Sequence, residues 1–91
     1  MTDTPDTDPE LQAAAAEELK AALTLSWAAL ARLIPYGDAY EGFGPGGSTL
    51  QLERGYIWRD QPRGDILCEV TASRPGGAEV RLSQVIRKPK P

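Results

Sequence analysis

The sequence predicts a single α+β domain in which one N-terminal amphipathic helix packs on a three-stranded antiparallel meander (α-β-β-β). Apolar residues in the first third recur at helical spacing, and three later segments alternate between apolar and polar residues. Short turn-like segments separate those three, as expected for antiparallel neighbours. A chain of 91 residues is long enough for one domain. We expect a disordered acidic tail at 1–7, the domain at 8–87 and a basic tail at 88–91.

The helix is expected from Pro9 to about Leu33, a stretch rich in Ala, Leu, Glu and Lys. Thr7 and Glu10 have the spacing of a capping box, and proline suits the first helical turn. Pro35 should end the helix. One apolar stripe follows the helical period: Leu11, Ala15, Leu19, Ala22, Leu23, Trp27, Leu30, Leu33 and Ile34.

The segment 35–47 is predicted to be a loop because it is rich in glycine. It also contains Tyr36, Tyr40 and Phe43, and aromatic side chains supply large contact areas. Its glycines match G-x-G-x-x-G, but the pattern leaves a helix and enters a strand, the reverse of a dinucleotide-binding site. We therefore interpret the segment as a contact surface and not as a phosphate site.

The strands are expected at 49–59, 65–73 and 78–87. Pro75-Gly76 fits the centre of a type II turn. Arg63-Gly64-Asp65 spells an adhesion tripeptide, but we interpret it as a tight turn in which Gly64 adopts the positive φ.

Alternation gives the sheet two unequal faces. The inner face, which should meet the helix, carries Leu50, Leu52, Tyr56, Trp58, Ile66, Cys68, Val70, Ala72, Val80, Leu82 and Ile86. The outer face carries Gln51, Glu53, Ile57, Arg59, Leu67, Glu69, Thr71, Arg81, Ser83, Val85 and Arg87. One helix covers one side of a sheet, so the outer face should meet water or a partner.

Arg54 interrupts the inner pattern. Because burying a charge is costly, the neighbouring Gly55 favours a β-bulge that turns Arg54 outward. The alternative is an inward Arg54 paired with an acid. A bulge would also reverse the faces of Tyr56 and Trp58.

The composition argues against an enzyme. The chain has no His and one Cys, which excludes an internal disulfide, the usual zinc sites and a histidine base. Cys68 alternates with Ile66 and Val70 and should be an inert core residue. Asp38 and Glu41 lack a recognisable nucleophile–base partner. We expect no catalytic residue, no metal and no cofactor.

Charge and hydropathy indicate a cytoplasmic protein. No apolar run reaches the roughly 18 residues of a membrane span, and the acidic start does not resemble a signal peptide. Residues 1–43 hold eight acidic and two basic side chains, whereas 44–91 hold five acidic and eight basic ones. This asymmetry is typical either of a basic binding face or of two halves that pack together.

The predicted function is a small non-catalytic protein-interaction module: a regulator, inhibitor or assembly factor of prokaryotic or phage-like origin. It would bind another protein, or a second copy of itself, through the outer face and the aromatic loop; the candidates are Tyr36, Tyr40, Phe43, Ile57, Arg59, Leu67, Arg81, Val85 and Arg87. The alternative is a nucleic-acid-binding accessory protein that uses Arg59, Arg63, Arg74, Arg81, Arg87, Lys88 and Lys90. Interleaved glutamates and a net charge of −3 weigh against this alternative.

Overall fold

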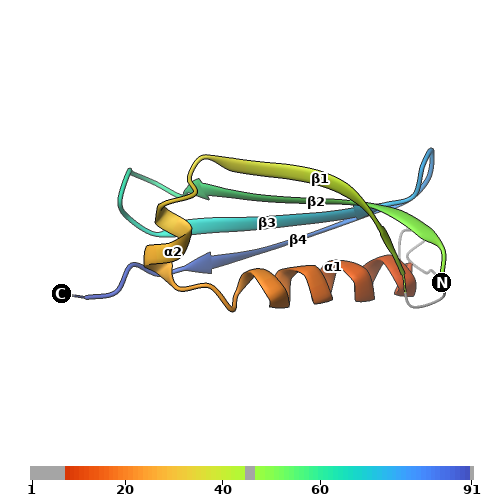
Figure 1. Ribbon diagram of the computed structural model, residues 1–91, viewed down its shortest axis with the longest axis horizontal. Helices are drawn as coiled ribbons and strands as arrows, with labels where there is room; N and C mark the ends of the chain where they lie inside the picture. Colours follow the sequence, from red (N-terminus) through yellow and green to blue (C-terminus); the bar gives the residue numbers. More distant parts are fainter. Residues whose placement is uncertain (1–7, 45–46, 91) are drawn as a thin grey trace, which may run out of the picture.

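A computed structural model of the chain describes residues 8–44 and 47–90. Two helices, α1 (Pro9–Ala22) and α2 (Trp27–Ala31), lie on one face of a four-stranded antiparallel sheet. The strands are β1 (Tyr36–Phe43), β2 (Thr49–Trp58), β3 (Ile66–Ser73) and β4 (Glu79–Ile86), paired in chain order (Figure 1). The α+β meander is confirmed, but the prediction of three strands is wrong because a further strand precedes them.

Helix α1 begins as a capped amphipathic segment. Asp8 is the N-cap, and its side chain accepts hydrogen bonds from the backbone N–H groups of Glu10 and Leu11. Pro9 occupies the first turn, as predicted. The expected cap, Thr7, lies outside the described residues, as does the rest of the predicted 1–7 tail.

The predicted continuous helix is broken between Ala22 and Trp27. The Thr24 hydroxyl donates to the Ala21 carbonyl at 2.6 Å, so it competes for a helical acceptor. Ser26 then caps α2 by accepting the Ala29 N–H at 3.1 Å. The break leaves Leu23 and Leu33 of the predicted stripe about two-fifths exposed, at 40% and 42%.

Strand β1 replaces the predicted aromatic loop. It pairs antiparallel with β2 along its whole length, from Tyr36 opposite Tyr56 to Phe43 opposite Thr49. The alternation signal was missing because β1 is an edge strand that is exposed along most of its length. Backbone pairing, and not burial of alternate side chains, holds this segment in the sheet.

The registers of β2 show no bulge at Gly55. Arg54, Gly55 and Tyr56 lie opposite Val70, Glu69 and Cys68 without interruption. Arg54 therefore shares the inner face with its neighbours two residues away, and the favoured bulge is wrong. In the β2–β3 turn the positive φ belongs to Arg63, at 67°, and not to Gly64 as predicted; Gly76, at 68°, fits the expected type II turn.

The core lies between the helices and the inner face. The predicted inner-face residues are confirmed: Leu50, Leu52, Tyr56, Ile66, Cys68, Val70 and Ala72 are buried, and Trp58, Val80, Leu82 and Ile86 pack against them. The core divides into one cluster beneath the start of α1 and another beside α2. In the part of the chain that the structure describes, neither helix has the length and apolarity to cross a membrane.

Candidate protein-interaction surface

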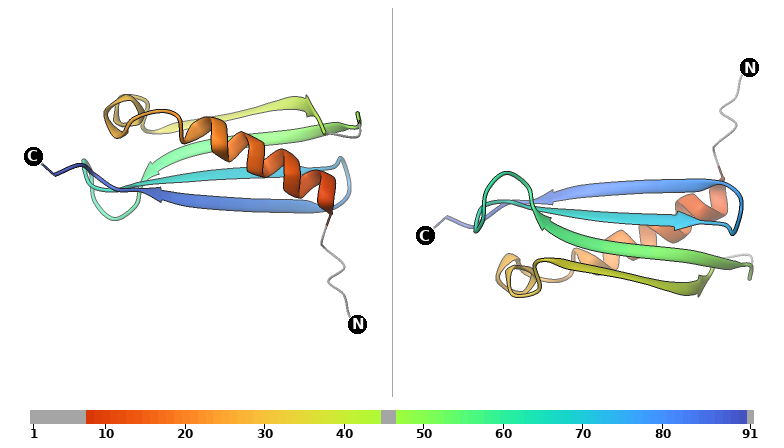
Figure 2. Two further views of the ribbon diagram at one scale, coloured as in Figure 1. Left: turned by 90° about the horizontal axis from the view of Figure 1, so that it is seen from below. Right: turned by 90° about the horizontal axis from the view of Figure 1, so that it is seen from above.

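The outer face of the sheet is open across its four strands. In the view from above, α1 lies behind the sheet and α2 lies beyond the start of β1, and no described helix crosses in front of the strands (Figure 2). The register aligns outer side chains in rows across the strands because directly opposite residues share a face. These rows decide which predicted interface residues lie together.

One row is apolar. Ile57 lies opposite Leu67, and Leu67 lies opposite Val85, so three aliphatic side chains from β2, β3 and β4 are direct neighbours. Ile57 is 45% exposed, and the other two are half-buried. Arg59 lies two residues after Ile57 and Arg87 lies two residues after Val85, and both arginines are exposed. The structure thus brings these five predicted residues together as an aliphatic row with arginines at its border; we call them the aliphatic patch.

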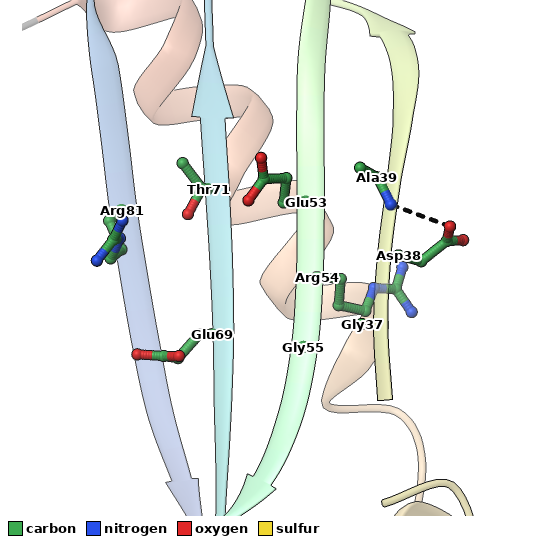
Figure 3. A pocket seen from close by; sticks show the side chains of 9 residues that line it. All are labelled: Gly37, Asp38, Ala39, Glu53, Arg54, Gly55, Glu69, Thr71 and Arg81. Carbon is green, nitrogen blue, oxygen red and sulfur yellow. Dashed lines mark hydrogen bonds between the residues drawn. The ribbon is translucent and has the colours of Figure 1, made fainter. Parts of the chain in front are cut away.

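A shallow hollow of about 430 Å³ lies beside the aliphatic patch. Its floor includes Gly37, Ala39 and Gly55, whose small side chains leave the sheet backbone uncovered. Glu53, Glu69, Thr71 and Arg81 border it from β2, β3 and β4 (Figure 3). The Arg81 guanidinium lies 3.4 Å from Glu79, in an ion pair whose side chains are both more than half exposed. The hollow therefore combines open space with mainly acidic edges.

The three aromatic residues of the predicted loop are divided between the two faces. Tyr36 faces inward and stacks on Tyr56, with ring centroids 5.1 Å apart. Tyr40 also lies on the inner face, opposite Leu52, and is 37% exposed. Phe43 belongs by register to the outer face, is 76% exposed, and also borders a groove of about 370 Å³ beside α1. They do not form one contact surface with the aliphatic patch.

The basic residues proposed for nucleic acid do not all lie together. Arg74 binds Asp8 and Glu10 at the start of α1, with nitrogen–oxygen distances of 2.9 and 2.6 Å. The Lys88 ammonium lies 5.9 Å from the centre of the Trp27 ring. Arg63 lies in the β2–β3 turn, at the same end of the sheet as Arg59 and Arg87. Lys90 follows Pro89 beyond the sheet. Arg74, in the β3–β4 turn, is therefore separated from the basic residues at the β2–β3 turn and is neutralised by two carboxylates.

Arg54 is the centre of a polar cluster on the inner face, so the favoured prediction that it turns outward is wrong. Its guanidinium pairs with Glu18 of α1, with its Nε 2.8 Å from the carboxylate, and donates to the Tyr56 hydroxyl at 3.1 Å. Burial alone would lower the pKa of Arg54, but the bonds to Tyr56 and Glu18 outweigh it and raise that pKa. The inward arginine is compensated by an acid, as the alternative reading required.

Tyr40 belongs to the same inner cluster. Burial, followed by its hydrogen bond with Glu18 and that group's negative charge, raises the pKa of Tyr40 to about 12. Tyr36 donates to Asp38 at 3.4 Å, and burial followed by the Asp38 charge raises the pKa of its phenol. These phenols are therefore held in their neutral form and do not serve as ready bases.

Cys68 is a core residue, as the alternation predicted. It is fully buried opposite Tyr56, and burial is the main cause that raises the pKa of its thiol. A thiol in this state is a weak nucleophile. Among residues 8–44 and 47–90, no group of three or more Asp, Glu or Cys side chains is placed to hold a metal ion.

Comparisons with models of protein families, with curated proteins and with solved structures each find no match to this chain.

Proposed function

We propose that this protein is a small non-catalytic interaction module that binds another protein through the aliphatic patch. The observation that carries the proposal is the alignment of Ile57, Leu67 and Val85 on adjacent strands of a face without a helix. An apolar centre beside arginines is the usual composition of a protein interface. A regulator, inhibitor or assembly factor could act in this way without a catalytic group.

The charges near the patch support a protein partner over nucleic acid. Glu53 and Glu69 border the adjoining hollow, and Arg81 is paired with Glu79. Phosphates would be repelled by these carboxylates, whereas a protein partner can present both aliphatic and basic side chains to them. Arg59 and Arg87 then form part of a charged rim.

The test compares two substitutions on strand β2. Ile57→Asp places a charge in the aliphatic patch, and Gln51→Asp places the same charge on the same face six residues away. The wild-type chain, tagged and expressed in its native host, is used to capture partners, which are then purified and titrated against each variant. We expect at least a tenfold loss of affinity for Ile57→Asp and little change for Gln51→Asp, with both variants folded by circular dichroism.

A second variant, Leu67→Asp, is titrated in the same way. If both Ile57→Asp and Leu67→Asp bound the partner as tightly as the wild type does, the proposal would be overturned. A parallel titration with generic duplex DNA examines the alternative function. Binding at low salt that weakens steeply as salt rises, and that is lost in the Arg81→Glu/Arg87→Glu double variant, would replace a protein partner with nucleic acid.

A further inference from the structure

Strand β1 has one backbone edge with which no strand of the described residues pairs. It is the first strand of the four-stranded order, so β2 is its neighbour on one side. The Gly44 N–H donates to the Ser48 carbonyl at 2.9 Å, which extends the β1–β2 ladder. Since ladder bonding alternates along an antiparallel strand, the even-numbered residues of β1 bond to β2 and the odd-numbered ones face the open edge.

The Ala39 N–H confirms this direction. It is bonded to the carboxylate of its own neighbour Asp38, at 2.9 Å, and the bond lies on the side of β1 away from β2 (Figure 3). Strand β1 contains neither lysine nor proline, which are common devices that prevent edge pairing. The edge is therefore available for another strand, with only two acidic residues, Asp38 and Glu41, to oppose it.

We propose that β1 pairs antiparallel with β1 of a second copy, centred on Tyr40, so that the two sheets join into one. The inference goes beyond the proposed function because it uses the edge of the sheet and not the aliphatic patch. A two-fold axis through the sheet keeps the outer faces of both copies on the same side. Residues that lie opposite each other across the new pair must then point to the same face of the sheet. The two-fold axis can therefore pass through a residue of β1 but not between two residues.

Charge excludes two of the possible centres. A centre on Asp38 would place Asp38 opposite Asp38, and a centre on Glu41 would do the same for Glu41; like charges directly opposite each other are destabilising. With the centre on Tyr40, Asp38 faces Gly42 and Glu41 faces Ala39 of the second copy. The two Glu41 side chains become diagonal neighbours, so we expect salt to strengthen the pairing.

Shape favours the centre on Tyr40 over the remaining ones. It places Phe43 of the second copy opposite Gly37, in the row of the outer face that continues to Gly55. Phe43 is 76% exposed, and no atom lies within 4 Å of the position that a Cβ on Gly37 would occupy. Each phenylalanine would thus cover the glycine end of the hollow in the other copy, an arrangement that stabilises glycine at a strand edge.

The pairing should be weak. A single pair of short strands buries less than the roughly 1,200 Å² of a standard interface, so we expect dissociation in the micromolar to millimolar range. Sedimentation velocity from about 10 μM to about 1 mM should show a monomer–dimer equilibrium. Phe43→Ala should weaken it at least fivefold, and Asp38→Ala should strengthen it by freeing the Ala39 N–H. A protein that stays monomeric at the highest concentration would overturn the proposal.

Disulfide trapping tests the register. Two facing Tyr40→Cys side chains would lie within disulfide range, because opposite Cα atoms in a non-hydrogen-bonded pair are about 4.5 Å apart. The parent chain, whose Cys68 is buried, and Glu41→Cys are the controls. We expect Tyr40→Cys to cross-link faster than both; faster cross-linking by Glu41→Cys would overturn the Tyr40 centre.

One further variant separates the two proposals. Ile57→Asp should leave the monomer–dimer equilibrium unchanged, because Ile57 is not on β1. Dimerisation that is lost in Ile57→Asp but kept in Phe43→Ala would mean that two copies associate through the aliphatic patch. That result would overturn the edge pairing and identify a second copy as the partner of the patch.

Discussion

Arg54 of β2 and Glu18 of α1 form an ion pair between the sheet and the helix, with side chains only 22% and 12% exposed. We expect Glu18→Gln to reduce the free energy of unfolding by about 1–3 kcal/mol, because it leaves a largely buried guanidinium without its counter-charge. Urea denaturation followed by circular dichroism measures this loss.

An Arg54→Met/Glu18→Leu double variant is the control for that pair. Replacing both charges with apolar groups removes the unpaired charge, so we expect the double variant to be more stable than Glu18→Gln alone. A double variant less stable than Glu18→Gln would show that the ion pair itself stabilises the fold, beyond the cost of leaving one charge unpaired.

Trp27 anchors α2 to the β2–β3 turn. Its indole N–H donates to the Gly64 carbonyl at 2.8 Å, and its ring lies 6.2 Å from that of Trp58. We expect Trp27→Ala to cost about 3 kcal/mol, near the lower end for such truncations because Trp27 is half-buried. Trp27→Phe should cost about 1 kcal/mol through the lost hydrogen bond. Thermal or urea unfolding measures both losses. If Trp27→Ala and Trp27→Phe reduced the free energy of unfolding by the same small amount, contacts other than those of Trp27 would hold α2 in place.

The raised pKa of Tyr40 predicts a change in stability at alkaline pH. Because its folded value of about 12 exceeds that of an unfolded phenol, near 10, the native state retains the proton longer. The contribution is complete below about pH 10 and is lost as the pH rises towards 12. Tyrosinate absorbance should show a late-titrating phenol that is absent from Tyr40→Phe. The same late phase in the variant would assign it to another tyrosine.

Asp8 predicts the opposite dependence in acid. Its bonds with Arg74 and with the Leu11 N–H lower the pKa of the carboxyl, so the unfolded state takes up the proton first. The stabilisation is complete above about pH 4, the unfolded value, and is lost as the pH falls further through the folded pKa. In urea titrations from neutral to acid pH, Asp8→Asn should be less stable than the wild type at pH 7 and should converge with it in acid. Parallel curves would contradict this role.

Side-chain patterning in the sequence predicted the buried part of the fold well. Apolar residues alternate with polar ones in β2 and β3 because one face of the sheet is covered by the helices. The buried positions, among them Leu50, Leu52, Ile66 and Val70, therefore recur at every second residue. Strand β1 has no such signal because its backbone pairs while its side chains stay largely exposed. The break at Thr24 and Ser26 was missed because the apolar stripe continues through it, although both residues favour helix ends over helix interiors.

The candidate site was predictable only in part. Ile57, Leu67 and Val85 were assigned to the outer face from alternation, but their alignment in one row depends on the register between strands. The partner of Arg54 could not be found from local sequence because Glu18 lies 36 residues away on another element. The local cost of burying charge instead favoured a bulge that the continuous register excludes.

Because the core is divided, the two ends of the molecule should unfold locally and independently of each other. One apolar cluster centres on Leu11 and the other on Leu30, and Leu19 packs against both. With so narrow an apolar link, α2 and the neighbouring strand ends should open as a cooperative unit of their own. Amide hydrogen exchange would then divide the fold into two protection classes, and Leu19→Ala should widen the difference between them. A single class throughout would show that the sheet backbone alone couples both ends.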